Sequence, residues 1–440
     1  MSRSPRDTAL SVLSACRDLG AWSDGSLKKA IARDKLDSRD AAFASRLCYG
    51  VLQNRALLDY RLGHYCNQRV DRLEALVREV LRLGAYQILM MDRVPDNAAV
   101  NESVEQIRRA GKPQAAGIVN AVLRKLAANK NDLPAISGRT PAEKLSIQYS
   151  HPHWLTLRMV SLLGAEEAEA FLHENNIPAP MTAQINPLKT GEEECLKELT
   201  DAGITVTAHP WMKGCYELSG SGDLEKLPAF AEGRITIQDP AARLVSVAAG
   251  LRGGEFVVDT CSAPGGKSFA AAMEMGNRGR ILSCDVHEHK LKLIESGAER
   301  LGISIVETAL ADGRKPREEL IGAADAVIVD VPCSGLGIIR KKPDIRYKDP
   351  KALANLPAVQ AAILENAATY VKTGGALLYS TCTILPEENE GVTSAFLAAH
   401  PEFEKEEFSL PFGGTAAEIT LWPQRHHSDG FYICKMRKIK

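Results

Sequence analysis

Two cysteines of this 440-residue chain stand where a thiol could act as a nucleophile. Cys333 follows an apolar run that ends at Asp330, and Cys382 follows the apolar run 375–379. Short apolar runs bounded by polar or proline-containing turns are typical of buried strands. Two cysteines at strand ends could therefore face one cleft, where a thiolate would attack an electron-poor carbon atom. The remaining cysteines outside the glycine turn are interpreted as small buried apolar residues: Cys16, Cys48, Cys66, Cys195, Cys215, Cys284 and Cys434.

A glycine turn lies between an apolar run and a helical pattern in residues 257–268, VVDTCSAPGGKS. Gly265 and Gly266 would let the backbone approach a ligand closely, and the helix that follows offers free N–H groups. A phosphate-binding P-loop requires a glycine where this chain has Cys261, and the chain contains no GxGxxG. The turn therefore argues against an NTPase and against a dinucleotide-dependent dehydrogenase.

Three aspartates end or follow successive apolar runs: Asp285, Asp312 and Asp330. An acid after the second strand of such a fold commonly binds ribose hydroxyls, and Asp285 stands 26 residues after Asp259. Asp312 would meet the amino group of an adenine. Each acid alone is better explained as a helix cap or turn residue, whereas three at successive strand ends favour one ligand site.

With these residues in view, residues 235–440 resemble the NOL1/NOP2/Sun family of RNA 5-methylcytosine methyltransferases. The shared blocks are CSAPGGKS, DVPCSGLG with RKKPDI, YSTCTILPEENE and DGFY. The N-terminal blocks RDTALSVLSACRDLG and AVNESVEQIRRAGKPQAAGIVNAVLRKL, with the later YSHPHW, resemble the NusB-like domain of the Sun/Fmu type of bacterial 16S rRNA methyltransferase. The resemblance covers nearly the whole chain.

This resemblance implies S-adenosylmethionine as the cofactor and Cys382 as the nucleophile, and it assigns release of the product to Cys333. Pattern alone does not rank the two thiols. Asp330 is our candidate for the group that hydrogen-bonds N3 of the base, with a purely cofactor-binding role as the alternative. The implied cofactor-binding residues are Cys261, Ser262, Ala263, Pro264, Gly265, Gly266, Lys267, Asp285, Asp312 and Asp330.

The reaction sets a physical demand on Cys382. Carbon 5 of cytosine is too weakly nucleophilic to take a methyl group directly, so the thiolate would add to C6 and raise the electron density at C5. Ionising an ordinary thiol at pH 7 costs about 2 kcal/mol. A positive neighbourhood would reduce this cost, and Lys267, Arg340 and Lys341 are the candidates besides the cationic cofactor.

The elements that must position these residues alternate between strand and helix. Residues 255–259, 280–285, 326–330 and 375–379 are strand candidates, and 352–371 is a helix candidate. This order predicts an α/β Rossmann-like domain over residues 234–440, with a mainly parallel sheet and ligands at the carboxyl ends of its strands. Residues 131–140 read as a linker.

Upstream of this domain we expect two further units. Apolar residues recur at helical spacing from Thr8 to Lys130, which predicts an all-α domain over residues 1–135. Residues 1–130 carry 22 lysines and arginines against 14 acids, a net charge of +8, which favours an anionic partner or equally a soluble basic bundle. Residues 141–233 mix short helical and extended patterns and predict a small α+β element. The candidate RNA-binding residues are Arg108, Arg109, Arg124, Arg340 and Lys341.

The expected partner is 16S ribosomal RNA, free or in early subunit assembly. Two alternatives stay open: a tRNA methyltransferase with the same catalytic domain, and a non-catalytic RNA-binding protein. The chain begins without an apolar signal-like segment and has no run of about 18 apolar residues, so we expect a cytoplasmic protein without membrane contact. The sequence contains no CxxC pair and no cysteine and histidine at the spacing of a zinc finger, so we expect no metal site. We also expect a monomer.

Overall fold

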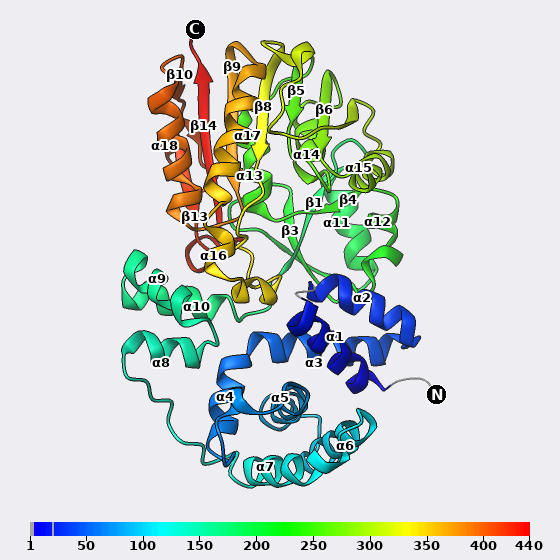
Figure 1. Ribbon diagram of the computed structural model, residues 1–440. Coiled ribbons are helices and arrows are strands. Elements are labelled where there is room, and N and C mark those ends of the chain that lie inside the picture. Colours follow the sequence, from blue (N-terminus) through cyan, green and yellow to red (C-terminus); the bar gives the residue numbers. More distant parts are fainter. Residues whose placement is uncertain (1–3, 20–21) are drawn as a thin grey trace. The chain divides into compact units, whose positions relative to one another are not determined.

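The computed structural model describes residues 4–19 and 22–440, apart from the side chain of Leu19, and divides the chain into two compact units (Figure 1). The first unit comprises Met1–Ile177 and Ile339–Lys348, and the second comprises Pro178–Ile338 and Asp349–Lys440. A short segment that begins six residues after Cys333 therefore belongs to the first unit, although the chain on either side of it belongs to the second.

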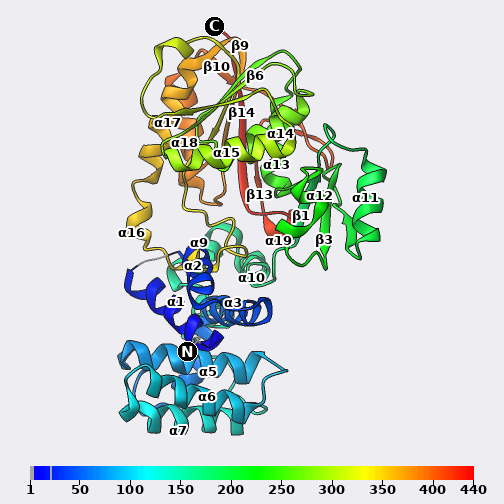
Figure 2. The same cartoon turned by 90° about the vertical axis from the view of Figure 1, so that its right-hand side faces the viewer.

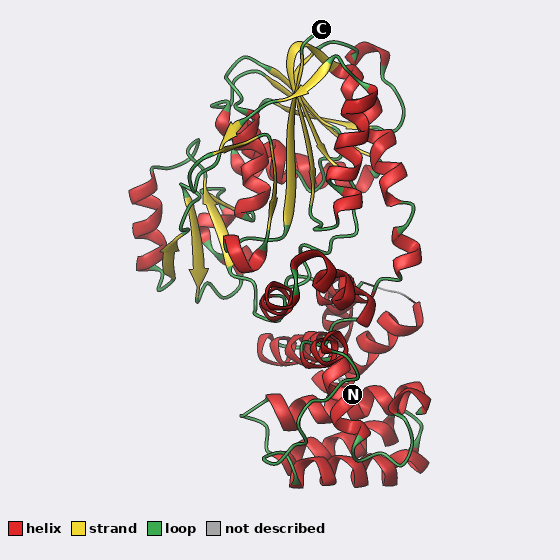
Figure 3. Ribbon diagram, turned by 90° about the vertical axis from the view of Figure 1, so that its left-hand side faces the viewer, coloured by secondary structure: helices red, strands yellow, loops and turns green. Residues whose placement is uncertain are grey.

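All regular elements in the described residues of the first unit are helices, as Figure 3 shows. This confirms the predicted all-α N-terminal domain, and the spacing of its apolar residues explains it: Val80, Leu81 and Leu123 are fully buried. The α-helices are α1 Pro5–Leu19, α2 Ser23–Asp34, α3 Ser38–Gln53, α4 Arg55–Gly63, α5 Ala75–Met90, α6 Asp96–Arg109, α7 Ala116–Ala128, α8 Pro141–Gln148, α9 His153–Leu163 and α10 Ala165–Glu174. The 3-10 helices are η1 Val70–Arg72, η2 Pro113–Ala115 and η5 Pro343–Tyr347.

The second unit begins with a small antiparallel sheet in the order β2-β3-β1-β4. Its strands are β1 Met181–Ile185, β2 Thr205–Ala208, β3 Cys215–Ser219 and β4 Ile235–Ile237. Helices α11 Glu192–Asp201, η3 Leu224–Lys226 and α12 Pro228–Ala231 accompany it. The sheet buries its own apolar cluster, which includes Ala183, Leu199 and Leu218. The predicted α+β character of this region is confirmed.

The large sheet of the second unit has the order β10-β14-β9-β8-β5-β6-β7, with β13 paired to β14. Strands β5 to β9 run parallel, and β14 pairs antiparallel with β9, which confirms the predicted mainly parallel sheet. The strands are β5 Phe256–Asp259, β6 Arg280–Asp285, β7 Val306–Leu310, β8 Ala324–Asp330, β9 Val371–Thr381, β10 Phe403–Lys405, β13 Glu418–Leu421 and β14 Phe431–Lys438. A separate pair is β11 Phe408–Ser409 with β12 Thr415–Ala416.

Helices cover both faces of this sheet, with α13 and α17 on opposite sides (Figure 2). They are α13 Pro240–Ala249, α14 Gly266–Glu274, α15 Glu288–Leu301, η4 Glu318–Leu320, α16 Pro350–Leu353, α17 Leu356–Tyr370, η6 Pro386–Glu388, α18 Glu390–Ala399 and α19 Pro423–His426. The single helix predicted over 352–371 is wrong. It is two helices, because Pro357 lacks the N–H that would donate to the carbonyl of Leu353, where α16 ends.

The strand order reverses between β5 and β8, because β6 and β7 lie to one side and β9 to the other. In open α/β sheets, ligands bind outside the carboxyl ends of the strands at such a reversal. Asp259 ends β5 and Asp330 ends β8. The fold therefore places two of the acids and the glycine turn at the position where a ligand site is expected.

Candidate active site

The glycine turn between β5 and α14 is fixed by its neighbours. The backbone N–H and hydroxyl of Ser262 both donate to the carbonyl of Cys284 on β6, at 2.8 and 2.9 Å. Gly265 has φ +108°, and a Cβ added there would lie 2.3 Å from the ring of Phe269. Only glycine fits this position, because both the backbone angle and the space exclude a side chain.

Asp259 lies beneath this turn as a fully buried carboxyl group. Its Oδ2 accepts a hydrogen bond from Ser268 at 2.7 Å, and Ser268 accepts one from Ser283 at the same distance. Oδ1 has no partner among the described residues. Burial raises the pKa of Asp259 to about 7, although the Ser268 bond favours its charged form. The sheet edge thus holds one carboxyl oxygen with unused hydrogen-bonding capacity.

Lys267 and Asp330 form an ion pair at the switch point. The Nζ–Oδ2 distance is 2.5 Å, and Ser380 on β9 donates to the other oxygen of Asp330 at 3.0 Å. Burial opposes the charge of Lys267, yet the negative neighbours, of which Asp330 is the strongest, outweigh it and raise the lysine pKa. Cys382 is one of these neighbours, so the ammonium group lies within electrostatic reach of this thiol. Lys267 is therefore a fixed positive charge beside the candidate nucleophile.

Asp285 and Asp312 lie at the ends of the next two strands. Asp285 is buried, and its Oδ1 accepts from the backbone N–H of His287 at 2.9 Å. Asp312 follows β7, and the guanidinium of Arg314 binds both its oxygens at 2.8 and 2.9 Å. These hydrogen bonds lower the pKa of Asp312 to about 2. Both acids lie at the predicted edge of the sheet, and Asp312 already has a cationic partner there.

The two candidate cysteines lie side by side, with Cys333 Sγ and Cys382 Sγ 3.2 Å apart. Both thiols are free and partly exposed. The contact with Cys382 and burial raise the pKa of Cys333 well above its ordinary value, because two neighbouring thiols do not both ionise. The 3.2 Å contact allows one thiol to donate a hydrogen bond to the other.

A buried carboxyl group that was not predicted from the sequence, that of Glu388, joins the two cysteine loops. Glu388 Oε2 accepts from the backbone N–H of Ser334 at 2.9 Å and from Gln360 at 2.8 Å. Its Oε1 faces the hydroxyl of Thr383 at 3.5 Å, and Ser334 and Thr383 contact each other at 2.6 Å. Ser334 and Thr383 directly follow the two cysteines, so Glu388 sets the spacing of the thiols. The only feature of the sequence that could have pointed to Glu388 was its place in the PEENE block, to which no role had been assigned.

A close contact between Gly337 and Gly430 also holds the loop of Cys382 in place. Gly337 donates its N–H to the carbonyl of Cys382 at 3.0 Å, and Gly430 donates to the carbonyl of Gly337 at 2.8 Å. A Cβ on Gly337 would lie 1.9 Å from the carbonyl oxygen of Gly430. This contact explains why the SGLG and DGFY blocks both carry glycine there.

The candidate RNA-binding residues of the first unit have local partners. Arg108 pairs with Glu105 at 2.5 Å, Arg109 with Asp7 at 3.2 Å, and Arg340 with Glu174 at 3.3 Å. Arg124 donates to Asn120 at 2.9 Å, and Lys341 is exposed. Arg340 and Lys341 belong to the first compact unit, whereas the cysteines belong to the second.

The described residues 4–19 and 22–440 contain no helix that is both long and apolar enough to cross a membrane. Within the same residues, histidine, cysteine, aspartate and glutamate side chains form no group of three that could hold a metal ion.

Three family models match the chain. The model for 16S rRNA methyltransferase RsmB/F matches residues 247–437, that for the NusB family matches 3–128, and that for the RsmF/B-like ferredoxin-like domain matches 151–225. The probable ribosomal RNA small subunit methyltransferase B of Bacillus subtilis (strain 168) is 36% identical, over 99% of each chain. The ribosomal RNA small subunit methyltransferase B of Sodalis glossinidius is 32% identical, over 92% of this chain and 91% of the relative.

Solved structures agree with these matches. The crystal structure of PH0851 is similar over all of both chains, with 28% identity and a TM-score of 0.81. A methyltransferase homolog protein from Pyrococcus horikoshii has 27% identity and a TM-score of 0.59, over 69% of this chain and all of its own. The doubly wound sheet and its glycine-turn site thus define a methyltransferase domain. The chain belongs to the ribosomal RNA small subunit methyltransferase B family, within the RsmB/F methyltransferases.

Proposed function

We propose that this protein transfers a methyl group from S-adenosylmethionine to carbon 5 of a cytosine in 16S ribosomal RNA, through a covalent bond between Cys382 and carbon 6. The observation that carries the proposal is the 3.2 Å contact between the two thiols beside the ion pair of Lys267 and Asp330. Two adjacent thiols serve a reaction in which one forms the covalent bond and the other assists its removal.

The cofactor site that we propose is the edge formed by residues 261–267 with Asp285, Asp312 and Asp330. Its donor set fits the cofactor: Asp285 suits ribose hydroxyls, the turn admits close contact with backbone, and buried Asp259 supports the turn from below. Bound S-adenosylmethionine would supply an electrophilic sulfonium methyl group. Asp312 would contact the adenine only if Arg314 shares its carboxylate, since both oxygens are already bound.

The roles of the thiols follow from their charges. We assign the nucleophile to Cys382, because the ammonium group of Lys267 lies within electrostatic reach of its sulfur, whereas burial and the contact with Cys382 raise the pKa of Cys333. The thiolate of Cys382 adds to C6. As the thiolate adds, N3 of the base takes up a proton from water, and Asp330, held by Lys267 and Ser380, accepts a hydrogen bond from this N3–H. After C5 has received the methyl group, its proton passes to a water molecule, the electrons of the C5–H bond form the C5–C6 double bond, and Cys382 leaves C6 as a thiolate beside the thiol of Cys333.

The relatives described above are ribosomal RNA small subunit methyltransferases, which supports ribosomal RNA as the substrate. The proposed division of labour is a NusB-like RNA-binding domain over 1–135, a guiding element over 141–233 and the catalytic domain over 234–440. Transfer of radiolabelled methyl from S-adenosylmethionine to unmodified 16S rRNA, with bulk tRNA in parallel, tests the proposal. We expect label in rRNA that digests to 5-methylcytidine. Label only in tRNA overturns the substrate, and label in neither overturns the activity.

Removing positive charge from the N-terminal unit should weaken RNA binding selectively. We expect Arg108→Gln with Arg124→Gln to lower the affinity for 16S rRNA and the slope of its salt dependence by about one counterion per charge, because phosphate contacts release bound cations. Affinity for S-adenosylmethionine should not change. Filter binding at several salt concentrations measures both quantities, and an unchanged slope would mean that these charges only meet solvent.

Glu388→Ala should lower methyl transfer by about 100-fold, because a nucleophile displaced by about 1 Å loses its reactive geometry. The affinity for S-adenosylmethionine should persist, since Glu388 contacts the cysteine loops and not the proposed cofactor edge. Glu388→Gln should recover most of the activity, because one amide oxygen is able to accept the bonds from Ser334 and Gln360. The matched control is Glu387→Ala at the exposed neighbouring position. Equal loss in both alanine variants would contradict a positioning role.

A further inference from the structure

The helical unit contains a cavity of about 240 Å³ that the proposed chemistry does not use. Its walls come from helices α1, α3, α4 and α5, from Trp22 and from the segment 339–348. Its lining residues include Trp22, Arg55, Glu79, Arg82, Tyr347 and Lys348. All of them belong to the first compact unit. We call this space the Trp22 cavity.

One cation of the cavity is available to an anionic ligand. Arg82 is compensated by Asp59 and Glu79, at 2.6 and 2.7 Å. Arg55, in contrast, has no ion pair among the described residues, and its guanidinium lies over the ring of Tyr347 at 4.9 Å. A guanidinium held on an aromatic face keeps its N–H groups free at its edge, where they suit a phosphate oxygen.

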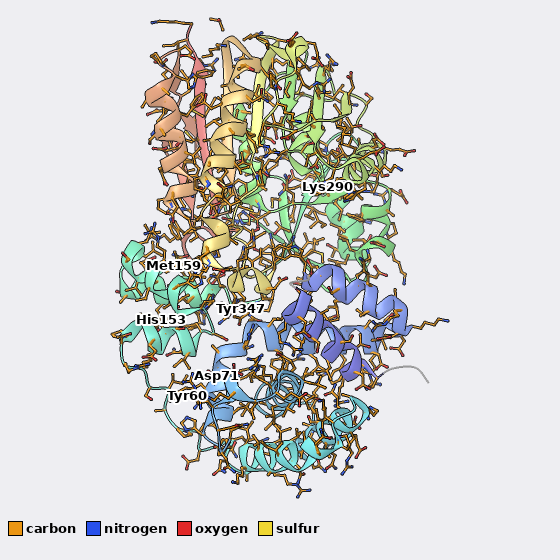
Figure 4. The ribbon with its side chains drawn as sticks, in the orientation of Figure 1. Tyr60, Asp71, His153, Met159, Lys290 and Tyr347 are labelled. Carbon is orange, nitrogen blue, oxygen red and sulfur yellow. The ribbon has the colours of Figure 1, made fainter. Side chains whose placement is uncertain are left out.

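Two aromatic side chains complete the cavity. Trp22 is 53% exposed, which is unusual for an indole, and the ammonium group of Lys348 lies 5.1 Å from its ring. Tyr347, labelled in Figure 4, is held in place because its hydroxyl donates to the carbonyl of Leu52 at 2.7 Å. A half-exposed indole at a cavity offers a stacking surface for a planar heterocycle.

The size of the cavity selects among ligands. Sites for complete small molecules measure roughly 300–1,000 Å³, so a cavity of about 240 Å³ suits one part of a larger chain. A base against Trp22 with its phosphate at Arg55 uses both the apolar and the cationic walls. Bases that are unstacked and read in this way come from single-stranded RNA.

We propose that the Trp22 cavity receives one unpaired nucleotide of the RNA substrate, whose base stacks on Trp22 and whose phosphate binds Arg55. This inference rests on the proposed function, because it names a contact of the same RNA. Tyr347 and Asp344 also stand 14 and 11 residues after Cys333 in the chain. A nucleotide bound here therefore contacts the segment that leaves the catalytic cysteine loop.

The test compares Trp22→Ala and Arg55→Gln with the matched control Arg69→Gln. Arg69 is an exposed arginine outside the cavity that pairs with Asp71, which is labelled in Figure 4. We expect about tenfold weaker binding of 16S rRNA for each cavity variant, because stacking or charge is lost, and an unchanged affinity for the control. Trp22→Phe should retain most of the affinity, since a phenyl ring also stacks. Thermal unfolding and S-adenosylmethionine binding verify that each variant is folded.

The outcomes separate the two proposals. If the wild type transfers no methyl group to RNA, the proposed function fails whatever the variants bind. If the wild type methylates 16S rRNA but both cavity variants bind it within twofold of wild type, the cavity proposal fails alone. Equal loss in Arg69→Gln also overturns it, because general charge would then explain the effect. A last experiment measures the affinity of cytidine monophosphate from the quenching of Trp22 fluorescence. If cytidine monophosphate binds as tightly as RNA does, the cavity is a site for free nucleotides and the proposal fails.

Discussion

Cys382→Ala should abolish methyl transfer to 16S rRNA, with a loss of roughly four orders of magnitude or more, because no other group replaces a covalent nucleophile. Cys333→Ala should instead leave a covalent enzyme–RNA complex that survives denaturing gel electrophoresis. The reason is geometric. The Cys333 thiol touches Cys382 Sγ at 3.2 Å, so its removal deprives the adduct of the neighbour that assists cleavage of the S–C6 bond.

The double variant provides the control for these two results. Cys333→Ala combined with Cys382→Ala should form no covalent complex, because the nucleophile is absent. Cys284→Ala is a matched control, since Cys284 is a buried cysteine of the same sheet without contact to either thiol in the described structure. A stable complex in Cys382→Ala, or its absence in Cys333→Ala, would contradict the assignment of the two roles.

Arg346→Met should lower the free energy of unfolding of the helical unit by about 3–5 kcal/mol, the largest effect on stability that we expect from one substitution. Arg346 is fully buried and donates to the carbonyls of Gln53 and Ser150, both at 3.1 Å. It also donates to Asn175 and Asn176 at 3.3 and 3.0 Å. Methionine would fill the space but leave four acceptors unsatisfied.

Chemical denaturation followed by circular dichroism measures this loss, and Lys342→Met supplies the comparison. Lys342 is exposed in the same segment, so its substitution should change stability by less than about 0.5 kcal/mol. Burial lowers the pKa of Arg346 to about 10, and the group therefore stays charged near neutral pH. Arg346→Lys should recover part of the stability, because an ammonium group keeps three donors. A loss below 1 kcal/mol in Arg346→Met would show that solvent replaces these bonds.

The ion pair of Lys267 and Asp330 illustrates which parts of the site could be predicted from the sequence. The glycine turn and the strand-end acid were both predicted, because strand periodicity and turn residues act over a few positions. Their direct contact at 2.5 Å was not, since the two residues stand 63 positions apart and meet only because β5 and β8 become neighbours. Arg340 and Lys341 show the same limit of sequence-based prediction. They follow the Cys333 loop closely in the chain, yet the structure assigns them to the other compact unit.

By itself, the sequence determined the fold class, the all-α N-terminal domain, the family and the two cysteines, because these depend on local periodicity and on contiguous motifs. Only the tertiary structure decided that Cys333 and Cys382 touch, that Glu388 spaces them, and that Arg346 is buried among carbonyls. It also created the Trp22 cavity from five separate stretches of chain. Such features arise from contacts between distant residues, which folding brings together and which no local pattern of residue types records.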